Sequence, residues 1–347
     1  MDMVDSNFGI TVLDILNETK QGLSDGMLAE GKTEQEISAF FESENWGEVY
    51  KEFCYKLIES LASYITDNLA DQDKEEKDLH ESYREHLQSV WGEGFAWLHQ
   101  FFSKCIDICE GYRWYIDQAE IAPAKCNLYN ALLAIHGKAL LVYAEIICLL
   151  ENGFPDGAYA HYRMLYELWA VAEFLNADTD DVSRAFLESA DAKANNETSH
   201  YKWAKISSRF CEIEKEITIS SIVSEAHRIL KTDSRVTASN THLKKLYTFP
   251  NQIIHPSAAG VLGRTAYSNE NLLVVGNADS GLCIPAMNAS MTMFNISQIF
   301  LSMVPCTVSA VGLGILNEII GKNVIPVFEE IEKNQLHTET SLSSEEA

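Results

Sequence analysis

Basic residues are scarce in this sequence, and several short motifs of common enzymes are missing. Its 347 residues include 26 lysines and arginines against 51 aspartates and glutamates, which gives a formal net charge of −25 at pH 7. A surface this acidic repels phosphate backbones and anionic membranes on average, so general DNA binding and membrane binding are not expected. The overall negative charge does not exclude a small local basic site. The sequence has no GxxxxGK[ST], no GxGxxG after a strand, no HExxH and no nucleophile elbow, which disfavours the corresponding enzyme classes.

Paired cysteines and metal-ligand patterns are also lacking. None of the eight cysteines belongs to a CxxC motif, and Cys105 and Cys109 lie one helical turn apart, as in a packed core. We therefore expect free thiols in a reducing compartment and a cytoplasmic protein. The N-terminus has no basic segment of a signal peptide. Because Glu167 and Glu173 lack the Glu-x-x-His partners of a di-iron bundle, we expect no metal and no other cofactor.

Hydrophobic runs of membrane-spanning length are interrupted. Charged and imidazole side chains break the run Asn130–Leu150, and amide side chains and Pro305 break Ile284–Leu316. A spanning helix needs about 20 mostly apolar residues without such breaks. Both runs are therefore expected to be buried helices of a soluble core.

Helical periodicity dominates what remains. Thr33 and Glu36 form a capping-box pattern, and apolar residues recur every three or four positions from Trp46 to Ile65. The stretch Ala158–Asn176 is bulky and apolar nearly all round, as in a central helix. Glycine and β-branched residues in Gly263–Pro285 indicate a short hairpin or an irregular loop. The sequence predicts an all-α, multi-helix bundle with a helical N-terminal region.

The domain organisation follows from these patterns. Residues 1–121 are expected to form the N-terminal helical region, and residues 122–320 the helical-bundle core. Within the core, further helices are expected over about 181–210 and 221–230. Residues 321–347 are polar and are expected to be a disordered tail.

The central helix carries one pair of charges. Arg163 and Glu167 lie four residues apart, so they share a face and can pair. Because the helix is apolar on its other sides, the pair is expected to be at least partly buried. Burying an ion pair costs several kcal/mol unless its geometry is good. The pair is either functional or a structural link between helices, and both readings stay open at this point.

Four motifs in order carry a family resemblance. They consist of a turn with Leu149, Leu150 and Gly153, then Arg163 and Glu167, then Tyr201, Trp203 and Ala204, and finally Tyr247, Asn251, His255 and Ser257. Over about residues 124–303 the sequence resembles the bacterial domain-of-unknown-function family 5677. The resemblance implies an α-helical bundle and no particular activity.

The last motif suggests a chemistry. His255 is the side chain of this set that titrates near neutral pH, and Pro256 is expected to end its helix. Asn251 lies one turn earlier on the same face. This arrangement is similar to that of the metal-independent helical ribonucleases of the higher-eukaryote-and-prokaryote nucleotide-binding (HEPN) class, whose motif is Arg-polar-x-x-x-His. Here Pro250 stands at the arginine position, so Arg163 would have to substitute from another helix.

This second resemblance implies RNA cleavage without a metal. His255 would act as general base or general acid, and Arg163 would stabilise charge on the phosphoryl oxygens. Glu167 would orient Arg163 or tune His255, while Asn251 would hold the substrate or the imidazole. The expected substrate-binding residues are Tyr247, Tyr201 and Ser257. Such enzymes are often toxins or antiphage effectors and are often dimers, which makes a homodimer an expectation of the same hypothesis.

A non-enzymatic reading competes with this one. The same polar cluster could bind an anionic small molecule or nucleotide, or organise a protein-interaction surface. In that case His255 would be a histidine of the last helical turn that bonds a carbonyl. RNA or a nucleotide at a local site is the expected partner under either binding hypothesis.

Overall fold

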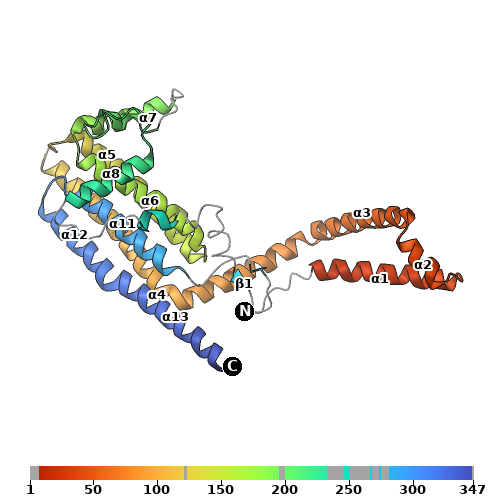
Figure 1. Cartoon of the computed structure of the whole chain (residues 1–347). Coiled ribbons are helices and arrows are strands. Elements are labelled where there is room, and N and C mark those ends of the chain that lie inside the picture. The colour runs from red at the N-terminus through yellow and green to blue at the C-terminus, as the bar shows by residue number, and fades with distance from the viewer. Residues whose placement is uncertain are drawn as a thin grey trace. The chain divides into compact units, whose positions relative to one another are not determined.

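The computed structural model describes residues 8–120, 123–194, 200–232, 245–250, 266–267, 273–274 and 281–345. These residues are almost entirely helical, so the predicted all-α bundle is confirmed (Figure 1). The described strands are β1 (Ala266–Tyr267) and β2 (Leu273–Val274), which pair antiparallel with Ala266 opposite Val274. The short hairpin therefore lies in the glycine-rich segment where the sequence favours one.

The chain divides into two compact units, Met1–His80 and Glu81–Ala347. The first unit contains α1 (Phe8–Ala29), α2 (Glu34–Phe41), α3 (Glu44–Asp67) and the beginning of α4 (Leu69–Gln118). The predicted capping box opens α2: the Glu36 amide donates to Thr33 Oγ1 at 3.3 Å, and the Thr33 amide donates to Glu36 Oε2 at 2.9 Å. Two N-terminal amides are thereby satisfied, which fixes the start of this helix.

The second unit is the helical bundle. Its elements after α4 are α5 (Cys126–Glu151), α6 (Pro155–Asn176), α7 (Asp180–Ala194), the 3-10 helix η1 (Lys202–Ile206), α8 (Ile219–Thr232), α11 (Cys283–Leu301), α12 (Thr307–Ile319), the π-helical η2 (Ile320–Val324) and α13 (Ile325–Glu345). Helices α5, α6 and α11 pack against one another at the centre, and α8 packs on α6. The sequence correctly predicts α6 as a central helix.

Large aromatic side chains attach α4 to this bundle. Phe101 lies 5.7 Å from the ring of Tyr143 on α5, and Tyr112 lies 5.4 Å from Phe300 on α11, both edge to face. These rings are fully buried. Because the C-terminal half of α4 shares the core of the second unit, the boundary between the units falls between His80 and Glu81 in the chain rather than at residue 121.

Two hydrogen bonds join α5 to α11, with the same separation in sequence on both helices. His136 Nε2 lies 3.0 Å from Ser297 Oγ, and the Tyr143 hydroxyl lies 2.7 Å from Ser290 Oγ. All four side chains are buried. The partners are seven residues apart on each helix and run in opposite directions. The two helices are therefore antiparallel, and a shift along either one would break both bonds.

The C-terminal segment differs from the expected disordered tail. Residues 320–345 are helical, and Val324 and Phe328 are fully buried. The Phe328 ring lies 5.5 Å from the ring of Trp91 on α4. It also packs against Gly94 of α4, where an added Cβ would lie only 2.9 Å from the Phe328 ring. Apolar residues four apart hold this helix on α4 although lysines and glutamates surround them in the sequence.

Two further expectations need correction. The helix expected over 181–210 is interrupted, because α7 ends at Ala194 and the chain continues after residue 200 into the 3-10 helix η1. The apolar run Ile284–Leu316 splits into α11 and α12 around Ser302–Cys306. Helix α11 is largely buried as expected, but Val311 and Ile315 on α12 are exposed. By length and composition alone, α5 and the stretch Thr307–Gln335 also fit a membrane span.

Candidate functional site

The predicted ion pair is present on α6. Arg163 Nε donates to Glu167 Oε1 at 3.0 Å, and the two side chains are 25% and 23% exposed. The pair is thus partly buried, as its position on a central helix predicts. Burial lowers the pKa of Arg163, but the hydrogen bond and the negative charge of Glu167 outweigh burial and raise it. The guanidinium is therefore held in its charged form beside the carboxylate.

Tyr247 joins this pair from a distant part of the chain. It belongs to the helical segment 245–250, and its hydroxyl donates to Glu167 Oε1 at 3.2 Å. The Arg163 guanidinium lies 5.7 Å from the centre of the Tyr247 ring, within the range of a cation–π interaction. The centre of the Tyr166 ring lies 5.8 Å from the centre of the Tyr247 ring. Tyr247 is consequently fixed by a hydrogen bond, a cation and a neighbouring ring.

Tyr201 lies close to the same carboxylate. It immediately precedes η1, whose Trp203 packs edge to face on Phe186 at 5.1 Å. Burial raises the pKa of Tyr201, and the negative charge of Glu167 raises it further. The structure therefore joins Arg163, Glu167 and Tyr247 by direct contacts, and Tyr201 lies near enough for the charge of Glu167 to affect its pKa. The other three predicted site residues, Asn251, His255 and Ser257, lie outside the described residues.

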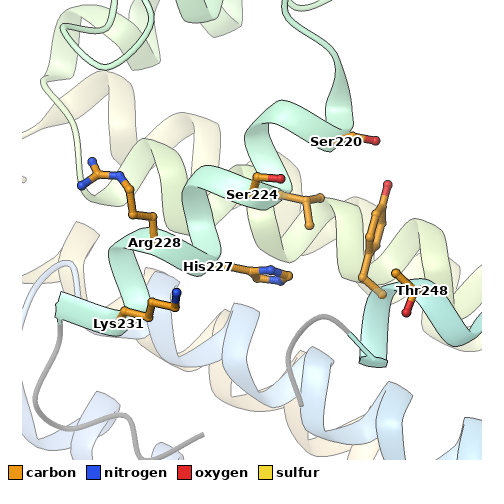
Figure 2. A pocket seen from close by; sticks show the side chains of 8 residues that line it. Ser220, Ser224, His227, Arg228, Lys231 and Thr248 are labelled. Carbon is orange, nitrogen blue, oxygen red and sulfur yellow. The ribbon is translucent and has the colours of Figure 1, made fainter. Parts of the chain in front are cut away.

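A pocket of about 460 Å³ opens beside Tyr247. Figure 2 shows its walls, which come from α8 and from the start of the segment that carries Tyr247. The lining residues are Ser220, Val223, Ser224, His227, Arg228, Lys231, Tyr247 and Thr248. Most of these side chains carry a hydroxyl, an imidazole or a positive charge, whereas the chain as a whole is strongly acidic.

The polar lining residues of α8 form one row. Ser220, Ser224, His227 and Lys231 follow one another at intervals of four, three and four residues, so they lie along one face of the helix. The apolar side of α8, with Ile222, Ala226 and Leu230, is buried in the bundle. This spacing is a signal in the sequence that would have located the pocket, but serine and histidine at helical intervals resemble an ordinary solvated face.

Comparison with known protein families gives one match. Residues 129–264 match the model of a family of unknown function, DUF5677. The matched region extends from α5 through α8 to beyond Tyr247, so it contains both the Arg163–Glu167 pair and the pocket. The family resemblance seen in the sequence is confirmed, whereas the resemblance to HEPN ribonucleases stays a prediction. No curated protein and no solved structure matches the chain.

Within the region that matches the family model, a hydrogen bond links the pocket to α6. His227 is buried, and its Nε2 lies 2.7 Å from the hydroxyl of Tyr166. Burial raises the pKa of Tyr166, and so do the neighbouring Tyr162 and Tyr247. The phenol is therefore neutral and available for this bond. A continuous chain of contacts runs from the Arg163–Glu167 pair through Tyr247 and Tyr166 to His227.

The two cations of the pocket differ in their partners. Arg228 donates to both oxygens of Glu225 at 2.8 and 2.6 Å. Burial raises the pKa of Glu225, but its hydrogen bonds to Arg228 and Arg209 outweigh burial and lower it, so the carboxylate is charged. Lys231 is exposed and makes no ion pair with any residue that the structure describes. In Figure 2 its amino group lies toward His227, while the Arg228 guanidinium points away.

Proposed function

We propose that the DUF5677 region binds a small phosphate-bearing ligand of mononucleotide size in the pocket between α8 and Tyr247. The observation that carries this proposal is the row of Ser220, Ser224, His227 and Lys231 along one wall, with the ammonium of Lys231 left without an ion-pair partner among the residues that the structure describes. Of the residues that the sequence assigns to an anion-binding cluster, Tyr247 is the one that lines this pocket.

The chemistry of the wall suits a phosphate. Lysine is a compact positive charge that binds phosphate oxygens without a fixed orientation. Serine and threonine hydroxyls can donate further hydrogen bonds, and Ser224 and Thr248 are exposed beside the pocket. In a protein of net charge −25, such a local cation is where an anion would be attracted.

The size and the apolar lining suit a planar organic group attached to that phosphate. A volume of about 460 Å³ lies within the usual range of ligand pockets, roughly 300–1,000 Å³. Val223 and the ring of Tyr247 supply apolar and aromatic surface. The Arg163–Glu167 pair then acts as a support: it holds Tyr247 in place from behind, and Arg163 is itself neutralised by Glu167.

The test is a binding comparison by isothermal titration calorimetry with AMP, UMP, adenosine and inorganic phosphate. Lys231→Ala should weaken AMP binding at least tenfold, because a charge-assisted hydrogen bond contributes roughly 1.5–3 kcal/mol and about 1.4 kcal/mol is tenfold. The matched control is Lys322→Ala, which removes an exposed lysine of η2. The proposal fails if AMP binds no more tightly than adenosine, or if both variants bind AMP alike.

RNA cleavage is the second candidate. The observation that favours it is that Arg163 and Tyr247, which the ribonuclease hypothesis puts in one site, lie together with the ring centre 5.7 Å from the guanidinium. The test is incubation of cellular RNA with the protein and a metal chelator, beside Arg163→Ala and His255→Ala. Cleavage by the unmodified protein that both variants lose, at unchanged melting temperatures, supports a ribonuclease. Absence of cleavage leaves ligand binding as the function to pursue.

A further inference from the structure

The described side chains of the first unit, Met1–His80, form almost no hydrophobic core. Among them, Ile37 is the one that is buried. A small helical unit stays folded mainly by burying the apolar faces of its helices, because short isolated helices are marginal in water. We therefore expect a binding partner to cover the exposed apolar surface of this unit.

Most of that surface belongs to α3. Its apolar residues recur at helical intervals and form a band that we call the α3 stripe: Trp46, Val49, Phe53, Leu57, Leu61 and Ile65. Helix α2 covers the beginning of the band, where Phe41 lies 4.8 Å from Trp46. Further along, Val49 and Ile65 are 41% and 48% exposed. An amphipathic helix with so much apolar exposure is typical of an interaction surface.

The exposed area on this face is a large part of what a dimer requires. Four large apolar side chains on or beside the stripe are at least 39% exposed: Val49, Tyr50, Tyr64 and Ile65. Side chains of this size at about half exposure present on the order of 100 Å² each, which gives about 400 Å² in all. A standard interface buries about 800 Å² on each partner, and the half-buried members of the stripe together with the polar rim supply the remainder.

The charges beside the stripe favour a second copy of the same chain. Lys51 and Lys56 alternate with Glu48, Glu52 and Glu59, so the flanks carry both signs, and Lys56 pairs with Glu52 at 2.8 Å. A flank of one sign would repel its own copy, whereas a mixed flank lets lysines of one copy face carboxylates of the other. A two-fold contact also needs only one surface that fits itself.

We infer that the chain forms a homodimer in which the α3 stripes of two copies pack against each other. The inference rests on the first unit alone and is independent of the pocket. Sedimentation analysis of the full chain should give a mass near twice 38.9 kDa at micromolar concentration. A chain that is still monomeric at about 100 micromolar would overturn the inference.

Variants then locate the interface. Leu57→Glu with Leu61→Glu should raise the dimer dissociation constant at least a hundredfold, because two charges would be buried in the contact. Ser63→Glu, which adds a charge on the polar side of the same helix, should leave it unchanged. A dimer that survives the double variant overturns the inference.

The milder change Leu57→Ala with Leu61→Ala guards against loss of the helix itself. Circular dichroism should show unchanged helix content, while the dissociation constant rises at least tenfold. An unchanged dissociation constant in this folded variant would also count against the α3 stripe.

Discussion

Acid should destabilise the bundle through His136. This side chain is 1% exposed and lies 5.5 Å from the ring of Phe300. Ser297 Oγ donates its hydrogen to the carbonyl of Met293 at 2.9 Å, so it can only accept from His136, whose Nε2 must carry the proton. Nδ1 is buried and has no hydrogen-bond partner among the described residues. A second proton there would create a buried, unpaired charge.

The size and sign of the effect follow from the pKa. Burial lowers the pKa of His136 from 6.5 to about 4. The unfolded chain therefore binds more protons than the folded chain between these values, so the free energy of unfolding falls as the pH falls from about 6.5 toward 4. Above pH 6.5 the stabilisation is complete. The 2.5-unit difference corresponds to about 3 kcal/mol in total, of which about 2 kcal/mol is lost between pH 7 and pH 5.

Urea denaturation at pH 7 and pH 5 measures this loss. Every tryptophan except Trp46 belongs to the second unit, so tryptophan fluorescence follows the unfolding of the bundle. His136→Gln removes the titrating group, and its stability should change about 2 kcal/mol less between the two pH values than that of the unmodified protein. The control His80→Gln, at an exposed position, should behave as the unmodified protein. Parallel losses in the unmodified protein and in His136→Gln would refute the reasoning.

Three other substitutions test the packing, each by urea denaturation. Ser290→Ala should destabilise the bundle by roughly 1–3 kcal/mol, because the Tyr143 hydroxyl loses its buried acceptor, and adding Tyr143→Phe should recover part of the loss. Gly153→Ala should cost about 2 kcal/mol, since Gly153 has φ of 72° and a Cβ would meet the Tyr83 hydroxyl at 2.4 Å. Phe328→Ala should cost about 3–5 kcal/mol if α13 is part of the core, and a disordered tail would predict no change.

Local patterns in the sequence predict the elements of this fold well. The capping box at Thr33, the central helix α6 and the pairing of Arg163 with Glu167 all depend on residues within four positions of one another. Such spacings are set by helix geometry itself. The apolar character of α6 on its other sides also predicts correctly that the pair is partly buried.

Contacts between distant residues are harder to predict from the sequence. The hydrogen bond from Tyr247 to Glu167 joins positions 80 residues apart, and the one from His136 to Ser297 joins positions 161 apart. The family motif named Tyr247 and Glu167 as members of one site, but no local pattern pairs His136 with Ser297. The sequence does not predict helix α13, because its charged residues outnumber the few apolar side chains that anchor it.

The pocket shows how a functional site can resemble an ordinary surface. The row from Ser220 to Lys231 has the spacing of a polar helix face, which is the commonest feature of a soluble protein. It became a candidate site because Tyr247 and Thr248 close it from another segment and because His227 is tied to Tyr166. Those relations depend on the tertiary fold, and α8 alone does not reveal them.

The most direct test of the central claim is hydrogen–deuterium exchange with and without saturating AMP. The account predicts slower exchange in peptides that cover α8 and residues 245–250, and no change in peptides of α3, which lies in the other unit. Protection confined to those peptides, and lost in Lys231→Ala at the same AMP concentration, would locate the ligand in the pocket. Bound AMP that protects other elements and leaves α8 unchanged would contradict the account.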